Sequence, residues 1–409
     1  MKIEIDSVKG FHDFLPPESL KREEIKKIVE KQFKLYGFLP VETPLIEFDE
    51  LMKSDKLPSE TEDSAISERF KLQDRGKRNL GLRYEFTFQL ARIFKQNPNI
   101  KLPFKRYQIG PLLRDEPVGP LRFRQFTQCD ADIIGDLTTN ADAECLSLVS
   151  DILKELKIPA EIQVNNRQLL SSIIESVEIK KTNEIMRELD KLDKLDIDIV
   201  KANLRKYASA NQIITLFKIL EKGPEFLKEN AFPGYEQLEE LISLCKDYNV
   251  KLKFNPYLAR GLSYYTGNIF EVRLPDRNES IAAGGRYDKV VGKYSSRDIP
   301  AVGISFGLER LSQLSQIQPE NPIKTIIISI NKDKEAIKLT KKLRKSDISC
   351  ITSFGKTGKA LEYANSQNVP YAIFLGEEEI QSKKYKLKDM SSGEEKLLSE
   401  KQLIQKLSK

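Results

Sequence analysis

The chain has 409 residues, 40% of them hydrophobic and 31% charged, with a formal net charge of +6. This length suits two or three domains, and the composition excludes a mostly disordered chain. No apolar run approaches the roughly eighteen residues of a membrane span, and the first ten residues lack the apolar stretch of a signal peptide, so we expect a cytoplasmic protein.

The histidine and cysteine content excludes several kinds of site. His12 is the one histidine, so zinc sites that need two are ruled out. A Ser-His-Asp triad would have to use His12, which lies in a proline-rich segment where we expect a structural role. Cys129, Cys145, Cys245 and Cys350 are far apart and form no CxxC motif, which predicts reduced thiols instead of a disulfide framework or a zinc ribbon.

The first third of the chain alternates helical and strand patterns. Residues 18–36 repeat apolar positions at helical spacing, and Gly37 fits the end of a helix. Residues 38–47 are typical of a short strand that prolines interrupt, which favours a sheet edge or an interface. A strand leading into a helix is predicted over 81–94. Two strands joined by a loop containing Pro117, Gly119 and Pro120 are predicted over 104–135, and a helix over 141–156.

The middle of the chain changes character. From 165 to 250 glycine is scarce and the periodicity is helical, which indicates a helical insertion. Strand patterns return at 268–274, 282–294 and 299–314. A sheet pattern that is interrupted by helices and then resumes indicates one domain inserted into another.

A basic C-terminal module follows a linker at 318–323. Strands and helices alternate as βαβαβ from 325 to 377, which predicts a small mixed sheet. Residues 322–409 carry 18 basic and 11 acidic residues, whereas the other 321 residues carry 49 and 50. This asymmetry indicates a polyanionic partner such as RNA, or else a lysine-rich solvated surface.

The strand expected at 122–134 carries the most informative pattern. Alternation places Arg124, Phe126, Gln128, Asp130 and Asp132 on one face, with Phe123, Gln125, Thr127, Cys129, Ala131 and Ile133 on the other. On the first face the aromatic ring could stack on a nucleobase, and the amide and carboxylate could hold a small polar ligand. A solvated outer face would give the same alternation.

Arginines and glycines surround this strand in the sequence. Arg114 suits a phosphate beside an aromatic ring, although a surface ion pair is the alternative. Gly303 is expected in a strand, and Gly307 at the start of a helix that carries Arg310; glycines at these positions let a ligand or a backbone approach closely. The alternative is a helix packed on the sheet, with Arg310 in no functional role. The segment GKTGKA at 355–360 is too short for a P-loop and has alanine where serine or threonine is needed.

Taken together, these segments resemble the class II aminoacyl-tRNA synthetases, and specifically the histidyl-tRNA synthetase family, nearly from end to end. YGFLPVETPLIE at 36–47, LLRDEP with RFRQFTQCDADIIG at 112–135, and AVGISFGLERL at 301–311 are similar to the three class motifs. ARGLSYYTGNIFEV at 259–272 and AAGGRYDKVVG at 282–292 are similar to the more restrictive histidine-specific segments. Ser263 departs from the aspartate that many members have there.

The resemblance implies an α+β fold, with a class II antiparallel sheet and flanking helices. It divides the chain into a catalytic core (1–163 and 251–320), a helical insertion (164–250) and a C-terminal α/β anticodon-binding domain (322–409). It also implies a homodimer, and Mg²⁺-dependent activation of histidine by ATP before transfer to the 3′ end of histidine tRNA.

The resemblance also assigns site residues. Arg114 and Arg310 would hold the ATP phosphates, Phe126 would stack on adenine, and Glu116 would contact the adenine end. The histidine-binding residues would be Glu85, Thr87 and Gln128 at the α-amino group, Asp132 and Tyr265 at the imidazole, Tyr287 along that pocket, and Arg260 at the carboxylate and α-phosphate.

Carboxylate attack on a phosphate needs alignment and charge neutralisation, which arginines and Mg²⁺ supply, so a site without histidine side chains is adequate. On an unbroken strand Arg260 and Tyr265 would face opposite ways, so we expect a bend between them, at Gly261.

One alternative belongs to a different functional class. The regulatory paralogue from histidine biosynthesis keeps the catalytic fold but is a binding subunit of an ATP phosphoribosyltransferase, and fold alone does not determine function. That paralogue lacks the anticodon-binding domain and usually loses catalytic residues. The basic C-terminal module, Arg114, Arg260 and Arg310 favour the synthetase. The set of Tyr265, Tyr287 and Asp132 argues against a synthetase for another amino acid.

Overall fold

The computed structural model describes residues 5–52, 69–120, 122–260, 264–275, 280–295 and 297–408. The chain forms two compact units, Met1–Ile317 and Gln318–Lys409. Within the described ranges, no helix has both the length and the apolar character needed to cross a bilayer.

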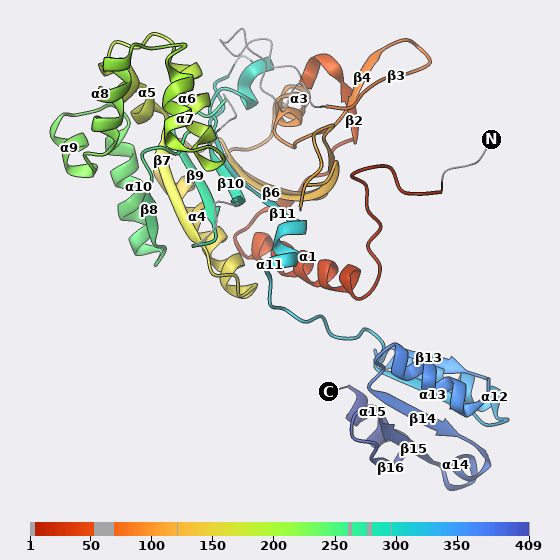
Figure 1. The fold of residues 1–409 in the computed structure, drawn as a ribbon. Helices are drawn as coiled ribbons and strands as arrows, with labels where there is room; N and C mark the ends of the chain where they lie inside the picture. The colour runs from red at the N-terminus through yellow and green to blue at the C-terminus, as the bar shows by residue number, and fades with distance from the viewer. Residues whose placement is uncertain are drawn as a thin grey trace. The chain divides into compact units, whose positions relative to one another are not determined.

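The first unit is built on an eight-stranded, mainly antiparallel sheet (Figure 1). Its strands are, in spatial order, β1 (Leu39–Pro40), β5 (Phe104–Leu113), β6 (Gln125–Ile134), β11 (Ala301–Gly307), β10 (Ser280–Arg286), β9 (Asn268–Arg273), β7 (Glu161–Asn166) and β8 (Leu252–Phe254). Only the outer pairs, β1 with β5 and β7 with β8, are parallel. The expected antiparallel sheet with flanking helices is confirmed.

The proline-interrupted segment contributes to two sheets. β1 lies at one edge of the large sheet, and β2 (Ile46–Phe48) is an edge strand of a three-stranded sheet with β4 (Asn79–Leu82) and β3 (Lys71–Gln73). The short helix η1 (Asp49–Met52) follows β2, and α3 (Phe88–Gln96) follows β4. The prediction of an edge position is confirmed.

Three helices, α1 (Glu18–Leu35), α4 (Thr139–Glu155) and α11 (Leu308–Leu314), cover the apolar face of the large sheet. α1 and α11 lie side by side there (Figure 1). Cys129, Ala131 and Ile133 of β6 belong to this core, as the alternation predicts. α1 ends before Gly37, whose φ of +77° is readily adopted only by glycine.

Residues 167–247 are helical, as expected. Their elements are α5 (Arg167–Ser176), α6 (Thr182–Leu189), η2 (Asp190–Asp193), α7 (Ile197–Leu204), α8 (Ala210–Leu220), α9 (Pro224–Glu229) and α10 (Tyr235–Asp247). Their apolar side chains share one continuous core with the large sheet. β7 runs to residue 166, so the boundary expected at 164 lies inside a strand, and the division into core and insertion stays a prediction.

The second unit is a mixed five-stranded sheet with helices on both faces. Its strand order is β13 (Cys350–Ser353), β12 (Thr325–Ser329), β14 (Tyr371–Leu375), β15 (Lys384–Asp389) and β16 (Glu395–Ser399). Its helices are α12 (Asp333–Lys345), α13 (Thr357–Ser366), α14 (Glu377–Ser382) and α15 (Glu400–Leu407). The βαβαβ pattern is confirmed, and the antiparallel hairpin β15–β16 extends it.

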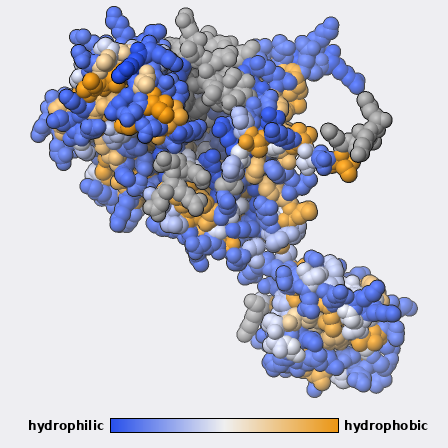
Figure 2. Space-filling model, viewed as in Figure 1, coloured by the Kyte–Doolittle hydropathy of each residue, from blue (hydrophilic) through white to orange (hydrophobic). Residues whose placement is uncertain are grey.

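Alternate residues of β12 serve the two cores of this unit. Ile327 packs with Leu339 and Leu343 of α12, whereas Ile326 and Ile328 pack on the side of α13. The surface of the unit visible in Figure 2 is mostly hydrophilic, with a smaller hydrophobic area.

Candidate active site

A cavity of about 640 Å³ lies in the first unit, over the large sheet. Every site residue named from the sequence lines it: Glu85, Thr87, Arg114, Glu116, Phe126, Gln128, Asp132, Arg260, Tyr265, Tyr287 and Arg310. They come from segments spread over more than 200 residues of sequence, which the antiparallel pairing of β5, β6, β11, β10 and β9 brings together.

The predicted alternation of side chains between the two faces is correct within β6 but wrong for the residues just before the strand. Phe126, Gln128, Asp130 and Asp132 line the cavity, as predicted. Arg124 does not, because β6 begins only at residue 125. Its guanidinium is paired with Asp115 at 3.2 Å, and Phe123, expected on the opposite face, lines the cavity instead.

Asp132 is a buried residue of the cavity lining. Its neighbour on β11 is Gly303, where a Cβ would stand 1.9 Å from the carboxylate oxygen, so only glycine leaves room for it. Tyr287 donates a hydrogen bond to Asp132, and Arg106 Nη2 lies 2.7 Å from the other oxygen. Burial raises the pKa of Asp132, although Arg106 and Tyr287 both oppose this.

A second buried carboxylate lies at the start of α3. Glu85 accepts a hydrogen bond from the backbone N–H of Phe88 at 2.8 Å and one from the Tyr264 hydroxyl at 3.4 Å. Burial raises the pKa of Glu85 to about 7. Thr87, the residue before α3, lines the same wall. This wall can hold a small cationic group.

Positively charged side chains, in contrast to these carboxylates, surround Phe126. The guanidinium of Arg114 lies 5.1 Å from the centre of the Phe126 ring, and its Nε donates to the carbonyl of Tyr84 at 3.1 Å. Arg310 donates to the carbonyl of Ser280, and Glu116 is paired with Arg122. A flat aromatic surface beside two arginines suits a nucleotide base with its phosphates.

The bend expected at Gly261 falls outside the described residues, which stop at Arg260 and resume at Tyr264. Arg260 itself has a φ of +56°, and it follows a turn, not a strand. Gly261 and Ser263 lie outside the described residues. Positive φ is uncommon for a residue with a side chain and occurs at functional sites as well as at turns and helix ends. Arg260 and Tyr265 both line the cavity.

The sequence interpretation missed several cavity residues. Asp130, which it placed on the correct face but gave no role, accepts a hydrogen bond from Ser305 at 2.6 Å, and burial raises its pKa to about 8. Glu271 lies in a fully buried strand, where an acidic residue is itself a signal. Asp190 and Asp193 reach the cavity from the helical insertion, and no pattern in their lysine-rich surroundings indicates this.

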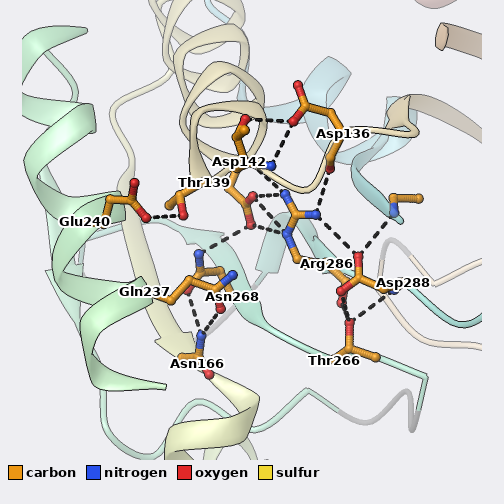
Figure 3. A network of polar contacts seen from close by, with 12 residues as sticks. Asp136, Thr139, Asp142, Asn166, Gln237, Glu240, Thr266, Asn268, Arg286 and Asp288 are labelled. Carbon is orange, nitrogen blue, oxygen red and sulfur yellow. Dashed lines mark hydrogen bonds and ion pairs between the residues drawn. The ribbon is translucent and has the colours of Figure 1, made fainter. Parts of the chain in front are cut away.

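A polar network surrounds Arg286, the residue before Tyr287 in the chain (Figure 3). The buried guanidinium of Arg286 donates to Asp142 of α4 at 3.1 Å and to the carbonyls of Asp136 and Thr138 at 2.9 Å. Asn268 of β9 donates to the same Asp142 at 3.4 Å. The network therefore fixes the end of β10, from which Tyr287 enters the cavity.

Two family models match the chain. The one described as histidyl-tRNA synthetase matches residues 10–311, and the one described as anticodon binding domain matches residues 324–409. Among curated proteins, histidine–tRNA ligase 1 of Bacillus cereus is 36% identical over 96% of this chain and 95% of its own length. Histidine–tRNA ligase of Finegoldia magna is 33% identical over 99% of this chain and its full length.

Solved structures have the same fold. Histidyl-tRNA synthetase from Nostoc sp. PCC 7120 superposes with a TM-score of 0.86 at 26% identity, covering 100% of this chain and 99% of that one. A Bacillus halodurans protein described as an ATP phosphoribosyltransferase regulatory subunit/histidyl-tRNA synthetase has a TM-score of 0.75 at 20% identity over 91% of this chain and 99% of its own, a likeness of fold alone. The family match over most of the chain, with its full-length relatives, shows that this chain belongs to the histidyl-tRNA synthetase family.

Proposed function

We propose that this chain is a cytoplasmic histidine–tRNA ligase, which forms histidyl-adenylate from histidine and ATP and transfers the histidyl group to the 3′ end of histidine tRNA. One observation carries the proposal: a single cavity combines an arginine-flanked aromatic ring with a buried Asp132 and two tyrosines. The first half suits ATP and the second suits an imidazole.

ATP would lie along the arginine side of the cavity. Phe126 would stack on adenine, Glu116 would contact the adenine end, and Arg114 and Arg310 would hold the phosphates. Mg²⁺ is usually held by substrate phosphates with only one or two carboxylates, and the described residues contain no group of three or more candidate ligands. Mg²⁺ would therefore enter with ATP and add neutralising charge at the phosphates.

Histidine would lie at the Asp132 end of the cavity. Asp132 and Tyr265 would pair with the two imidazole nitrogens, and Tyr287 would line that pocket. Unpaired polar groups would then penalise a wrong amino acid. Glu85, Thr87 and Gln128 would hold the α-amino group. This arrangement directs the carboxylate of histidine towards the phosphates.

Arg260 would lie where the two substrates meet. A carboxylate oxygen of histidine forms a bond to the α-phosphorus as the bond from that phosphorus to diphosphate breaks, and the electron pair leaves with diphosphate. Arg260 would hold the carboxylate and the α-phosphate together and offset the charge that develops there. No protein nucleophile is needed for this step.

The second unit would bind the anticodon of the tRNA. Its lysine-rich composition suits a phosphate backbone, and the side chains of Phe354 and Tyr363 are about half exposed, as stacking on bases requires. The exposed apolar side chains of Leu39, Ile46 and Phe48 on the two edge strands suit the interface of a homodimer.

Histidine-dependent ATP–pyrophosphate exchange by the purified full-length chain tests the proposal. Exchange with histidine, and with no other amino acid, is the expected result. A folded dimer that binds histidine but does not catalyse exchange would instead match the regulatory subunit of an ATP phosphoribosyltransferase.

A further inference from the structure

The helical insertion reaches the proposed catalytic arginine through a series of ion pairs. The short helix η2 brings Asp190 and Asp193 to the cavity wall. Asp193 Oδ1 lies 2.6 Å from Arg273 Nη2. Arg273 donates from Nε to Glu271 Oε2 at 3.1 Å, and the other oxygen of Glu271 lies 3.2 Å from Arg260 Nη1. The series thus connects an insertion residue to the centre of the reaction.

Glu271 is the shared member of this series. It is buried on β9 between two guanidinium groups. Burial alone raises the pKa of a carboxyl group, but Arg260 and Arg273 more than offset it, and the pKa of Glu271 lies below its ordinary value. Glu271 is therefore an ionised acceptor for which two cations compete.

Only part of the Arg260 guanidinium is held. Nη1 is paired with Glu271, whereas the buried Nε has no hydrogen-bond partner within the described residues. Buried donors are normally satisfied, so Arg260 has hydrogen-bonding capacity that its contact with Glu271 does not use. The contact of Nη1 with Glu271 therefore sets the direction of the guanidinium.

We infer that Asp193 is a positioning residue for Arg260, so that the insertion is part of the apparatus for adenylate formation. Asp193 neutralises Arg273, which leaves Glu271 shared between the two arginines and keeps Arg260 in place. Without this carboxylate, Arg273 draws Glu271 towards itself and Arg260 loses its fixed orientation. The inference rests on the proposed function, because it assigns Asp193 a role in histidine activation.

Asp193→Asn in the full-length chain tests the inference by pyrophosphate exchange. The side chain of Asp193 is 31% exposed, so the substitution leaves the fold intact. We expect kcat to fall about fivefold to tenfold, with the KM values for histidine and ATP changing less than about twofold, because alignment is lost and not substrate binding. Asp193→Glu, which keeps the charge, should recover most of the rate.

Asp198→Asn is the matched control. Asp198 is exposed in the first turn of α7 and does not line the cavity. Its substitution removes the same negative charge as Asp193→Asn does. Its exchange rate should equal that of the unsubstituted chain. If Asp193→Asn also equals it, or loses thermal stability and raises both KM values, the inference fails while the proposed function stands. Absence of exchange in the unsubstituted chain would refute the proposed function itself.

Discussion

Arg106 and Asp132 form a buried ion pair beneath the candidate active site, with Nη2 of Arg106 2.7 Å from Oδ2 of Asp132. The two residues are directly opposite each other on β5 and β6, so the register of the sheet sets their separation. Arg106 has no exposed surface. The pair supplies an anionic acceptor at a nearly buried position of the cavity wall, which a bare carboxylate could not do at acceptable cost.

Asp132→Asn should raise the KM for histidine and also lower the free energy of unfolding. The amide leaves Arg106 as a buried unpaired cation, so the free energy of unfolding should fall by about 3 kcal/mol. The KM for histidine should rise at least about tenfold, and the KM for ATP by less than about twofold. Urea denaturation and exchange kinetics measure the two effects. Asp247→Asn, at an exposed position on α10, should change neither quantity; an unchanged KM for histidine in Asp132→Asn would remove Asp132 from the imidazole pocket.

Arg260→Ala should abolish adenylate formation and leave the fold intact. Glu271 keeps its contacts with Arg273 in this variant, so its buried carboxylate is not left without a cation. We expect the exchange rate to fall at least about 1000-fold, as when a group that stabilises transition-state charge is removed. Arg205→Ala, at an exposed position after α7, should keep the full rate. An unchanged rate in Arg260→Ala would exclude this residue from the mechanism.

Much of this site could be predicted from local patterns. Alternation placed Phe126, Gln128 and Asp132 on the face of β6 that lines the cavity, because an antiparallel strand with one apolar face has only one register. The same argument placed Arg124 and Phe123 wrongly, since periodicity does not show where a strand begins. Its failure is confined to the three residues before β6.

The remaining cavity residues depend on contacts that no local pattern carries. Asp190 and Asp193 lie in a helical stretch whose pattern reports only which of its side chains face its own core. Their position beside Arg260 follows from how the insertion packs on β9, about 80 residues further along the chain. Alternation indicates a bend between Arg260 and Tyr265, but it does not indicate the left-handed backbone of Arg260 itself.

Histidine binding should strengthen as the pH rises through about 7. Burial raises the pKa of Glu85 to about 7 in the free protein, and its ionised form attracts the α-ammonium group of histidine. The ionisation of Glu85 should make the Kd for histidine, measured by calorimetry, up to about tenfold lower at pH about 8 than at pH about 6. The imidazole of the ligand titrates in the same range, so the ratio of each Kd to that of Glu85→Gln isolates the contribution of Glu85. A ratio that does not vary with pH would contradict this prediction.

A chain that ends before Pro322 should activate histidine but charge tRNA poorly. The first unit ends at Ile317 and has its own core, so histidine-dependent exchange should persist. The basic second unit is lost, and we expect kcat/KM for aminoacylation to fall at least about 100-fold, in line with the loss of several phosphate contacts. Exchange is the control for folding. Equal charging by the shortened chain would refute the anticodon-binding role of the second unit.

Arg286→Met should destabilise the first unit through the network in Figure 3. Burial raises the pKa of Asp142 to about 6, and Arg286 is the cation that opposes this shift. Without Arg286 the buried carboxylate of Asp142 loses its cation, and the carbonyls of Asp136 and Thr138 lose their donor, so the free energy of unfolding should fall by about 3 to 5 kcal/mol at neutral pH. The loss should shrink as the pH falls, because a protonated Asp142 needs no cation.

The double variant Arg286→Met with Asp142→Asn separates the charge from the packing. It leaves no buried charge unpaired, so it should be more stable than Arg286→Met alone, and the two single losses should not add. Arg297→Met, at an exposed position, should lower stability by less than about 0.5 kcal/mol. Urea denaturation of the unsubstituted chain, the two single variants at Arg286 and Asp142, and the double variant measures the coupling energy between the two residues. Additive losses would mean that the ion pair between Arg286 and Asp142 contributes nothing to stability, and that Arg286 stabilises β10 through its contacts with Asp288 and the two carbonyls.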